Sequence, residues 1–302
     1  MKKKYKNLSK KLILGTANLG TYKYGINEYK ISNDNKKKIL KYAIKNEITY
    51  FDTANTYGSE KNLNFQNIKV FTKIKPIKKN LKFKKKKELV SFIEDSIKSS
   101  LKKLKINSIY CVLIHKVEDL KINNYDVIKI LNSFKEKGLI QNIGVSIDFY
   151  QNIENIIKNK SIRFIQLPVN IYDKRWKIFF TKKNKKYTKN KKFIARSIFV
   201  QGVLNKNIWP NKIRDQKKTI HKLNNILIKK LSIKKIDELM FRYVNSLKEI
   251  DYILFGVTKL STIKKNLIYF NKKKIIQKKI NLIDNFTNKI ENKFYDIINW
   301  NS

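Results

Sequence analysis

The chain has 302 residues, of which 42% are apolar and 12% aromatic, so it can form a core and lacks the composition of a disordered protein. Its 69 Lys and Arg against 23 Asp and Glu give a formal net charge of +46, which suggests nucleic acid or an anionic membrane as a partner. Five of these basic residues are Arg, and the Lys residues are spread from Lys2 to Lys293, which favours a compositional bias over a base-reading surface.

No export or membrane segment is expected. The N-terminal stretch is basic, but its apolar run, Leu12–Leu14, is far shorter than the ~7–15-residue core of a signal peptide. No uninterrupted apolar run reaches the ~18 residues of a transmembrane helix. The single cysteine, Cys111, excludes an intrachain disulfide and a thiolate metal cluster. We therefore expect a cytoplasmic protein with no metal site and no membrane partner, of undetermined oligomeric state.

Short runs of β-branched and aromatic residues alternate along the chain with longer segments of helical period. This alternation is typical of β–α units around a parallel sheet. The expected strands, in chain order, are Lys11–Leu14, Thr49–Phe51, Lys69–Thr72, Ile109–Ile114, Gln141–Ser146, Phe164–Leu167, Phe193–Ala195 and Tyr252–Phe255. A chain of this length with eight such strands is expected to be an α/β protein, a single-domain (β/α)8 TIM barrel over residues 1–302.

The segments between the strands carry apolar residues at helical spacing. The rows that mark the first helices are Ile39–Ile44, Leu89–Leu101 and Val127–Phe134. Ser32 or Asp34 can cap the first of them. Two more helices are expected near 215–231 and 233–247, and an extra C-terminal helix over about 277–298. The Lys-rich stretch 182–192 is expected to be a solvated helix end or loop.

Three apolar strands end in polar residues that can act together. Asp52 follows the second strand, Lys73 the third and His115 the fourth. The carboxyl ends of all strands of a parallel barrel open on one face, so these side chains should converge there. Tyr57 lies on the loop just after the second strand, so it is expected at the same face.

These four side chains suit the reduction of a carbonyl. A hydride delivered to carbon leaves an alkoxide that needs a proton, which the Tyr57 phenol can supply. The ammonium of Lys73, itself held by Asp52, eases proton release because it favours the phenolate. His115 can orient the substrate oxygen by a hydrogen bond. The hydride is beyond side-chain chemistry and implies a nicotinamide cofactor.

Each of these residues is weak evidence by itself. A lone Asp at a strand end is often a cap, a lone Tyr in a loop is usually a surface aromatic, and Lys is abundant throughout this chain. His115 counts for more, because the chain has two His residues and the other, His221, lies in a Lys-rich helical stretch where a solvated position is expected.

Seven motifs in order give the chain a family resemblance. They are LGTANLG, FDTANTYGSE, VFTKIK, VLIHK, GLIQNIGVS, FIQLPVN and FGVTKLSTIKKNL, over about residues 12–267. Together they resemble the signatures of the aldo-keto reductases, a family of barrel enzymes that use NAD(P)H, and in particular a bacterial branch. The resemblance implies that the four-residue catalytic tetrad is Asp52, Tyr57, Lys73 and His115.

The resemblance also implies how the cofactor is held. Ser146 and Gln166 would contact the nicotinamide carboxamide, Gly15 and Thr16 would line the same cavity beside Asp52, and Asn170 would shape the loop after the sixth strand. Toward the chain end, the positions that match those holding the phosphates and adenine are Ser197, Gly256, Lys259 and Asn266.

The chain departs from the family pattern at three positions. Ile147 stands where many members have Asn, and Arg196 stands where many have a Tyr that stacks on the nicotinamide; a guanidinium plane can stack as well. Thr262 stands where a cofactor-selecting Arg is common. That leaves NADP or NAD undecided, although Lys259, Lys264 and Lys265 could serve a 2′-phosphate. We expect a moderate preference for NADP(H).

The leading hypothesis is therefore an NAD(P)H-dependent oxidoreductase that reduces the carbonyl of an aldehyde, ketone or sugar, or catalyses the reverse. Gly15–Gly20 does not have the spacing of a Rossmann fingerprint, so a barrel would hold the cofactor. Two alternatives remain. One is a basic barrel that binds nucleic acid or another polyanion, and the other is a regulatory subunit that binds the cofactor without turnover.

Overall fold

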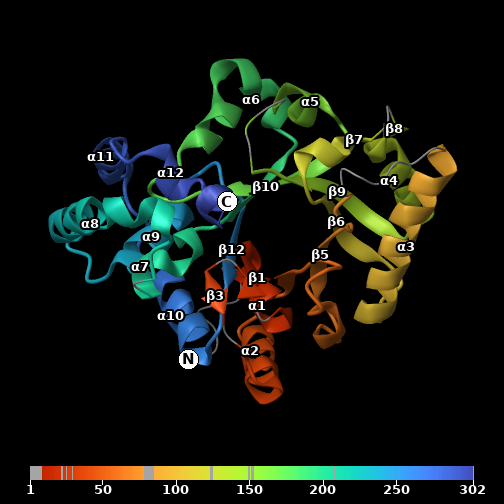
Figure 1. Cartoon of the computed structure of the whole chain (residues 1–302), viewed down its shortest axis with the longest axis horizontal. Coiled ribbons are helices and arrows are strands. Elements are labelled where there is room, and N and C mark those ends of the chain that lie inside the picture. Colours follow the sequence, from red (N-terminus) through yellow and green to blue (C-terminus); the bar gives the residue numbers. More distant parts are fainter. Residues whose placement is uncertain are drawn as a thin grey trace.

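The computed structural model describes residues 9–21, 23–24, 26–28, 30–77, 85–122, 125–148, 150, 153–206 and 208–301; most of the basic N-terminal stretch lies outside them. Eight parallel strands close into a barrel in the order β1-β12-β11-β10-β9-β6-β5-β4 (Figure 1). They are β1 Leu12–Gly15, β4 Tyr50–Asp52, β5 Lys69–Lys73, β6 Ile109–Ile114, β9 Ile140–Ser146, β10 Ile162–Pro168, β11 Lys192–Arg196 and β12 Tyr252–Gly256. The expected TIM barrel is confirmed, and each predicted strand overlaps one of these eight.

The barrel strands are buried on both faces, which explains why they appear in the sequence as nearly continuous apolar runs. The interior is filled by side chains that include Phe71, Phe164 and the fully buried Cys111. At the amino-terminal ends of the strands, the ring of Tyr50 lies 5.6 Å from that of Tyr110 between centroids. This mouth is therefore packed with aromatic side chains, and the polar strand ends lie at the opposite mouth.

Helices surround the barrel in Figure 1. They are α1 Ala17–Gly20, α2 Asn33–Lys45, α3 Lys86–Leu104, α4 Val127–Glu136, α5 Ile153–Lys158, α6 Lys182–Thr188, α7 Val203–Lys206, α8 Lys217–Leu231, α9 Ile236–Ser246, α10 Leu260–Phe270, α11 Gln277–Thr287 and α12 Asn292–Tyr295. The cap of α2 is Ser32, whose Oγ accepts from the backbone N–H of Asn35 at 3.3 Å. Across the described ranges, none of the helices is both long and apolar enough to cross a membrane.

One β–α unit lacks its α-helix. The connection from β4 to β5, residues 53–68, is fully described and contains a short 3₁₀ turn, Glu60–Asn62. Leu63, Phe65 and Ile68 do not have the repeated three- and four-residue spacing of a helical stripe. Asn67 has a φ of 60°, which an α-helix does not contain. Tyr57 is therefore carried by a polar loop.

The C-terminal region also differs from the single helix expected over 277–298. It consists of α11, α12 and a 3₁₀ turn, Ile297–Asn301. The ammonium of Lys174 lies at the end of α11, where it donates to the carbonyl of Asp284 at 2.9 Å and to the side chain of Asn288 at 3.0 Å. A cation at the C-terminus of a helix stabilises that end through the last carbonyls.

The expected pair of helices before the last strand is confirmed, and the other segments differ from expectation in detail. The Lys-rich stretch contains α6 and then enters β11, and the pair of helices before β12 appears as α8 and α9. Two short antiparallel pairs were not expected from the sequence. They are β2 Lys23–Tyr24 with β3 Asn27–Glu28, and β7 Lys121–Ile122 with β8 Tyr125–Asp126.

Candidate active site

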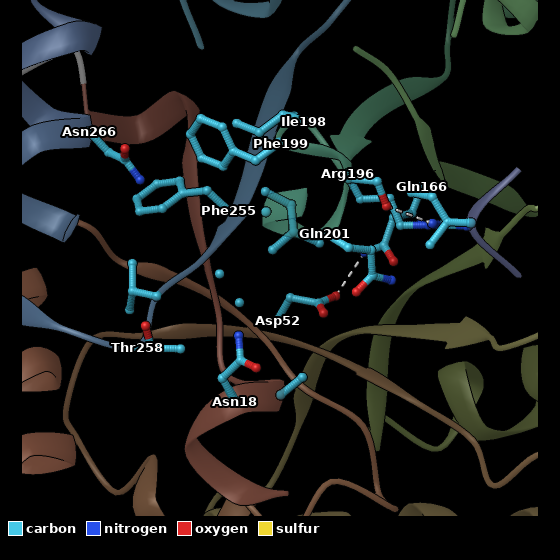
Figure 2. A pocket seen from close by; sticks show the side chains of 18 of the residues that line it. Asn18, Asp52, Gln166, Arg196, Ile198, Phe199, Gln201, Phe255, Thr258 and Asn266 are labelled. Carbon is cyan, nitrogen blue, oxygen red and sulfur yellow. Dashed lines mark hydrogen bonds between the residues drawn. The ribbon is translucent and has the colours of Figure 1, made fainter. Parts of the chain in front are cut away.

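A cavity of about 620 Å³ opens at the carboxyl ends of the barrel strands (Figure 2). Asp52, Tyr57, Lys73 and His115 all line it, so the structure brings the four proposed catalytic side chains together. They come from β4, the loop after it, β5 and the residue that follows β6. This is the mouth at which barrel enzymes place their active sites.

Lys73 is the centre of this group. It is 3% exposed, and its ammonium donates to both carboxylate oxygens of Asp52, at 2.7 and 2.9 Å, and to the carbonyl of Thr53 at 2.9 Å. The same ammonium lies 5.4 Å from the centroid of the Tyr57 ring. The two buried charges compensate each other, and the ammonium lies beside the phenol that is expected to lose a proton.

His115 also lies beside Tyr57. The two rings meet edge to face, with centroids 6.3 Å apart. Burial, followed by the positive charges of Lys73, Arg196 and Lys116, lowers the pKa of His115 to about 3. The imidazole is therefore neutral at neutral pH and carries one N–H donor. Its Nδ1 is buried without a hydrogen-bond partner in the described part of the chain.

The loop that carries Tyr57 is fixed by a buried polar network. The Ser59 hydroxyl lies 2.9 Å from the hydroxyls of Thr16 and Thr53. Glu60, fully buried, accepts from Thr72 at 2.8 Å, and its other carboxylate oxygen lies 3.7 Å from the Lys103 ammonium. Ser59 and Glu60 were not expected at the site from the sequence, although both belong to the FDTANTYGSE motif.

Gly20 allows α1 to pack directly against this loop. A Cβ at position 20 would lie 2.0 Å from the carbonyl oxygen of Tyr57 and 2.5 Å from the amide nitrogen of Ser59. No real Cβ makes contacts that short, so any other residue would displace α1 or the loop.

The residues expected at the nicotinamide end contact one another. The amide of Gln166 donates to Asp52 at 2.8 Å and accepts from the Ser146 hydroxyl at 3.3 Å. Arg196 donates to the carbonyl of Ile147 at 2.9 Å and pairs with the carboxylate of Asp148. Asp148 also lines the cavity and was not predicted. Asp148 and Arg196 are far apart in the sequence, and the fold brings them together at the ends of β9 and β11.

Most of the other expected cofactor residues lie in the same cavity. Gly15, Ser197, Gly256 and Asn266 line it. Thr16 and Lys259 do not belong to its lining among the described residues. Thr16 is fully buried and donates to the backbone carbonyl of Asp52 at 2.9 Å, whereas Lys259 is exposed at the start of α10. The sequence motifs place these two residues near the cavity but do not show where their side chains point.

Asn170 and Lys264 lie outside the cavity lining in the described structure. The Asn170 side chain accepts from the backbone N–H groups of Tyr172 and Asp173, both at 2.9 Å, and so holds the loop after β10. Lys264 is exposed, with its ammonium 5.6 Å from the centroid of the Tyr42 ring.

Asn266 provides a test of whether the cavity fits a nucleotide cofactor. It is 1% exposed, it lines the cavity, and neither its amide nitrogen nor its oxygen has a partner among the described residues. A buried amide without partners costs free energy unless a ligand supplies them. The volume also lies within the range of about 300–1,000 Å³ usual for cofactor sites. The residues present therefore fit a nicotinamide dinucleotide.

Comparisons with known proteins place the chain in a family. The family model described as "Aldo/keto reductase family" matches residues 11–288, whereas no curated protein matches significantly. Solved structures share the fold. An aldo-keto reductase of Bacillus halodurans in its holo form has a TM-score of 0.73 and 18% identity, and covers 94% of this chain and 95% of its own.

Two further structures are similar. A glycerol dehydrogenase of Gluconobacter oxydans has a TM-score of 0.70 and 19% identity, covering 93% of this chain and 94% of its own. A thermostable aldo-keto reductase in complex with the inhibitor epalrestat has a TM-score of 0.64 and 21% identity, covering 91% and 94%. The structural likenesses support the fold, and the family model covers most of the sequence. The chain belongs to the aldo/keto reductase family, whose general activity is NAD(P)H-dependent oxidoreduction of carbonyl compounds.

Proposed function

We propose that this chain reduces the carbonyl of an aldehyde, ketone or sugar to the alcohol, or catalyses the reverse, with Tyr57 as the proton donor. The observation that carries the proposal is the buried Lys73 ammonium, which is bonded to Asp52 and lies 5.4 Å from the centroid of the Tyr57 ring. A cation fixed beside a phenol stabilises the phenolate that remains after proton transfer.

A bound nicotinamide supplies the hydride, and the side chains of the site handle the proton. The Tyr57 hydroxyl delivers a proton to the oxygen of the reacting carbonyl. Asp52 keeps Lys73 in place through two hydrogen bonds, and Lys73 compensates the charge left on Tyr57. His115 is neutral because its pKa lies at about 3, so it orients the carbonyl oxygen as a hydrogen-bond donor without adding a charge.

The cofactor would extend along the cavity. Ser146, Gln166 and Arg196 would hold its nicotinamide end, and Gly15, Ser197, Gly256 and Asn266 the remainder. We infer a moderate preference for NADP(H), because Lys265 and Thr262 both line the cavity and can meet a 2′-phosphate with a cation and a hydroxyl. Lys259 and Lys264 are exposed and would act at longer range.

Binding and turnover can be tested in sequence. The protein is first titrated with NADPH and with NADH, following nucleotide fluorescence, and then supplied with a panel of aldehydes, ketones and sugars while nicotinamide absorbance is recorded. We expect both nucleotides to bind, NADPH more tightly, and absorbance to fall when a carbonyl is added. Failure of both nucleotides to bind would reject the proposal. Binding without turnover in either direction would favour the regulatory subunit.

A further inference from the structure

A carboxylate lines the part of the cavity formed by α9 and α10. Of the cavity-lining carboxylates, Asp52 is paired with Lys73 and Asp148 with Arg196, as described above. The third, Asp237, lies in the first turn of α9 and is 4% exposed. The cavity-lining residues of α10 are Thr262, Lys265 and Asn266.

Asp237 is tied to Lys265. The ammonium of Lys265 forms an ion pair with one carboxylate oxygen of Asp237, and the hydroxyl of Tyr269 donates to the other at 3.2 Å. The Lys265 side chain is 39% exposed and the Asp237 side chain 5%. The lysine at this end of the cavity is therefore held by a nearly buried anion of opposite charge.

If the chain binds a nicotinamide dinucleotide, as proposed above, the Asp237–Lys265 pair lies near the adenosine half of that cofactor. The reactive ring has to lie beside Tyr57, so the other half of the cofactor occupies the rest of the cavity. Asn266 and Gln166 appear at opposite sides of the cavity in Figure 2. The unpartnered amide of Asn266 offers a donor and an acceptor there, and Lys265 and Thr262 lie on the same helix.

We propose that Asp237 determines cofactor specificity by limiting the preference for NADPH over NADH. A 2′-phosphate carries a charge of about −1.5 to −2, so Lys265 attracts it and Asp237 repels it. The 2′-hydroxyl of NADH carries no charge and can donate to a carboxylate. Asp237 thus opposes the phosphate in two ways: by its own charge, and by engaging the cation that would bind it.

Asp237→Asn isolates this effect. The amide has nearly the same shape, and its oxygen can still accept from Tyr269, but the negative charge is lost. The ammonium of Lys265 then loses its ion-pair partner and becomes available to a 2′-phosphate. We expect NADPH affinity to rise about tenfold relative to NADH affinity, the order expected for removing one nearby charge in a partly solvated site.

Glu238 offers a matched control in the same helical turn. It is as buried as Asp237, but it pairs with Lys272 at 2.7 Å and Arg242 at 2.9 Å and is not among the described residues of the cavity lining. Glu238→Gln removes the same charge from the next position without altering the partner of Lys265. We expect the ratio of the two nucleotide affinities to change by less than about twofold.

The measurement is the dissociation constant of each purified variant for NADPH and for NADH by fluorescence titration, with thermal unfolding to verify folding. Asp237→Asn should raise the affinity ratio in favour of NADPH, and Lys265→Gln, a second variant at a partly exposed position, should lower it. The inference is wrong if Asp237→Asn and Glu238→Gln have the same ratio of NADPH to NADH affinity. It is also wrong if Lys265→Gln leaves this ratio unchanged. If the unmodified chain binds neither nucleotide, both the proposed function and this inference fail. If it binds both nucleotides and Asp237→Asn does not change the affinity ratio, only this inference is rejected.

Discussion

The two ends of the cavity are built differently. At the proposed catalytic end, Asp52 and Lys73 belong to barrel strands and are bonded to each other without any ligand. At the other end, Asp237, Lys265 and Asn266 belong to helices, Lys265 is partly exposed, and the Asn266 amide has no partner in the described structure. For the reaction proposed above, this difference means that the catalytic groups are preorganised on rigid elements, whereas a bound nucleotide would complete the contacts at the other end.

The largest effect is expected at the catalytic end. Tyr57→Phe removes one hydroxyl and little volume, so folding and NADPH affinity should persist. Because general acid catalysis contributes about 10²- to 10⁴-fold, turnover should fall by at least that range. Steady-state kinetics with NADPH titration measures both quantities. Tyr187→Phe, in α6 and away from the cavity lining, is the control. Nearly full carbonyl reduction by Tyr57→Phe would show that another group donates the proton.

Lys73→Met tests whether the catalytic end acts as one unit. Without the ammonium, the phenol loses the charge that favours proton release, so a loss of turnover similar to that of Tyr57→Phe is expected. The change also leaves Asp52 buried without its ion-pair partner, which costs stability. The double variant should be little slower than either single variant, because both changes disable the same step. Multiplicative losses in the kinetic cycle would mean that Lys73 acts separately from Tyr57.

Gly20→Ala tests the fixed position of the Tyr57 loop. The added methyl group would collide with the Tyr57 carbonyl oxygen and the Ser59 amide, so we expect the loop to shift and kcat to fall about tenfold, with nucleotide affinity nearly unchanged. Gly138→Ala is a suitable control, because a Cβ there meets nothing within 4 Å and its φ of +74° affects stability alone. An unchanged kcat in a folded Gly20→Ala protein would contradict this account.

A smaller effect concerns pH and His115. Its pKa of about 3 lies below the ordinary value near 6.5, so between these values the unfolded chain binds a proton that the folded chain does not. Folding stability attributable to His115 is therefore complete above about pH 6.5 and is lost as the pH falls toward 3, by up to about 1.4 kcal/mol per pH unit. Denaturant unfolding of His115→Gln and the unmodified chain across this range gives the difference. Parallel curves would argue against a neutral, buried His115.

Another buried group makes the comparison with His115→Gln necessary. Burial raises the pKa of Asp119 to about 6, so its contribution has the opposite sign: its stability is present below the ordinary carboxyl value and is lost as the pH rises through 6. The two contributions overlap in the unmodified chain. Subtracting the His115→Gln curve removes Asp119 from the result, because it is common to both proteins.

The strands and the convergence of the four proposed catalytic side chains could be predicted because their signals are local. A strand buried on both faces is a continuous apolar run, and a polar residue directly after it lies at the barrel mouth. The pairing of Asp237 with Lys265 is not local, since it joins two helices across an intervening strand. The contact of Lys174 with the end of α11 is also long-range, because Lys174 lies 110 positions from Asp284. Contacts of this kind carry no periodic signature in the sequence.

The direction of a side chain is a second property that the motifs did not provide. Thr16 was expected to line the cavity, yet its side chain is fully buried outside the described lining and its hydroxyl donates to the backbone carbonyl of Asp52. The absence of a helix between β4 and β5 was partly predictable. Residues 53–68 lack a helical stripe of apolar residues, but a count of strands alone assigns a helix to every β–α unit. Local patterns therefore located the site more reliably than they assigned individual contacts.

The burial of Cys111 inside the barrel has a consequence for reactivity. Burial raises the pKa of this thiol well above its ordinary value, and the side chain is fully enclosed by the strands. A thiol becomes nucleophilic as the thiolate, so the folded barrel shields it from alkylation and oxidation. Since the chain has one cysteine, the rate at which a thiol reagent modifies it reports how often the barrel opens. The molecule thus carries an internal reporter of its own unfolding, which needs no added label.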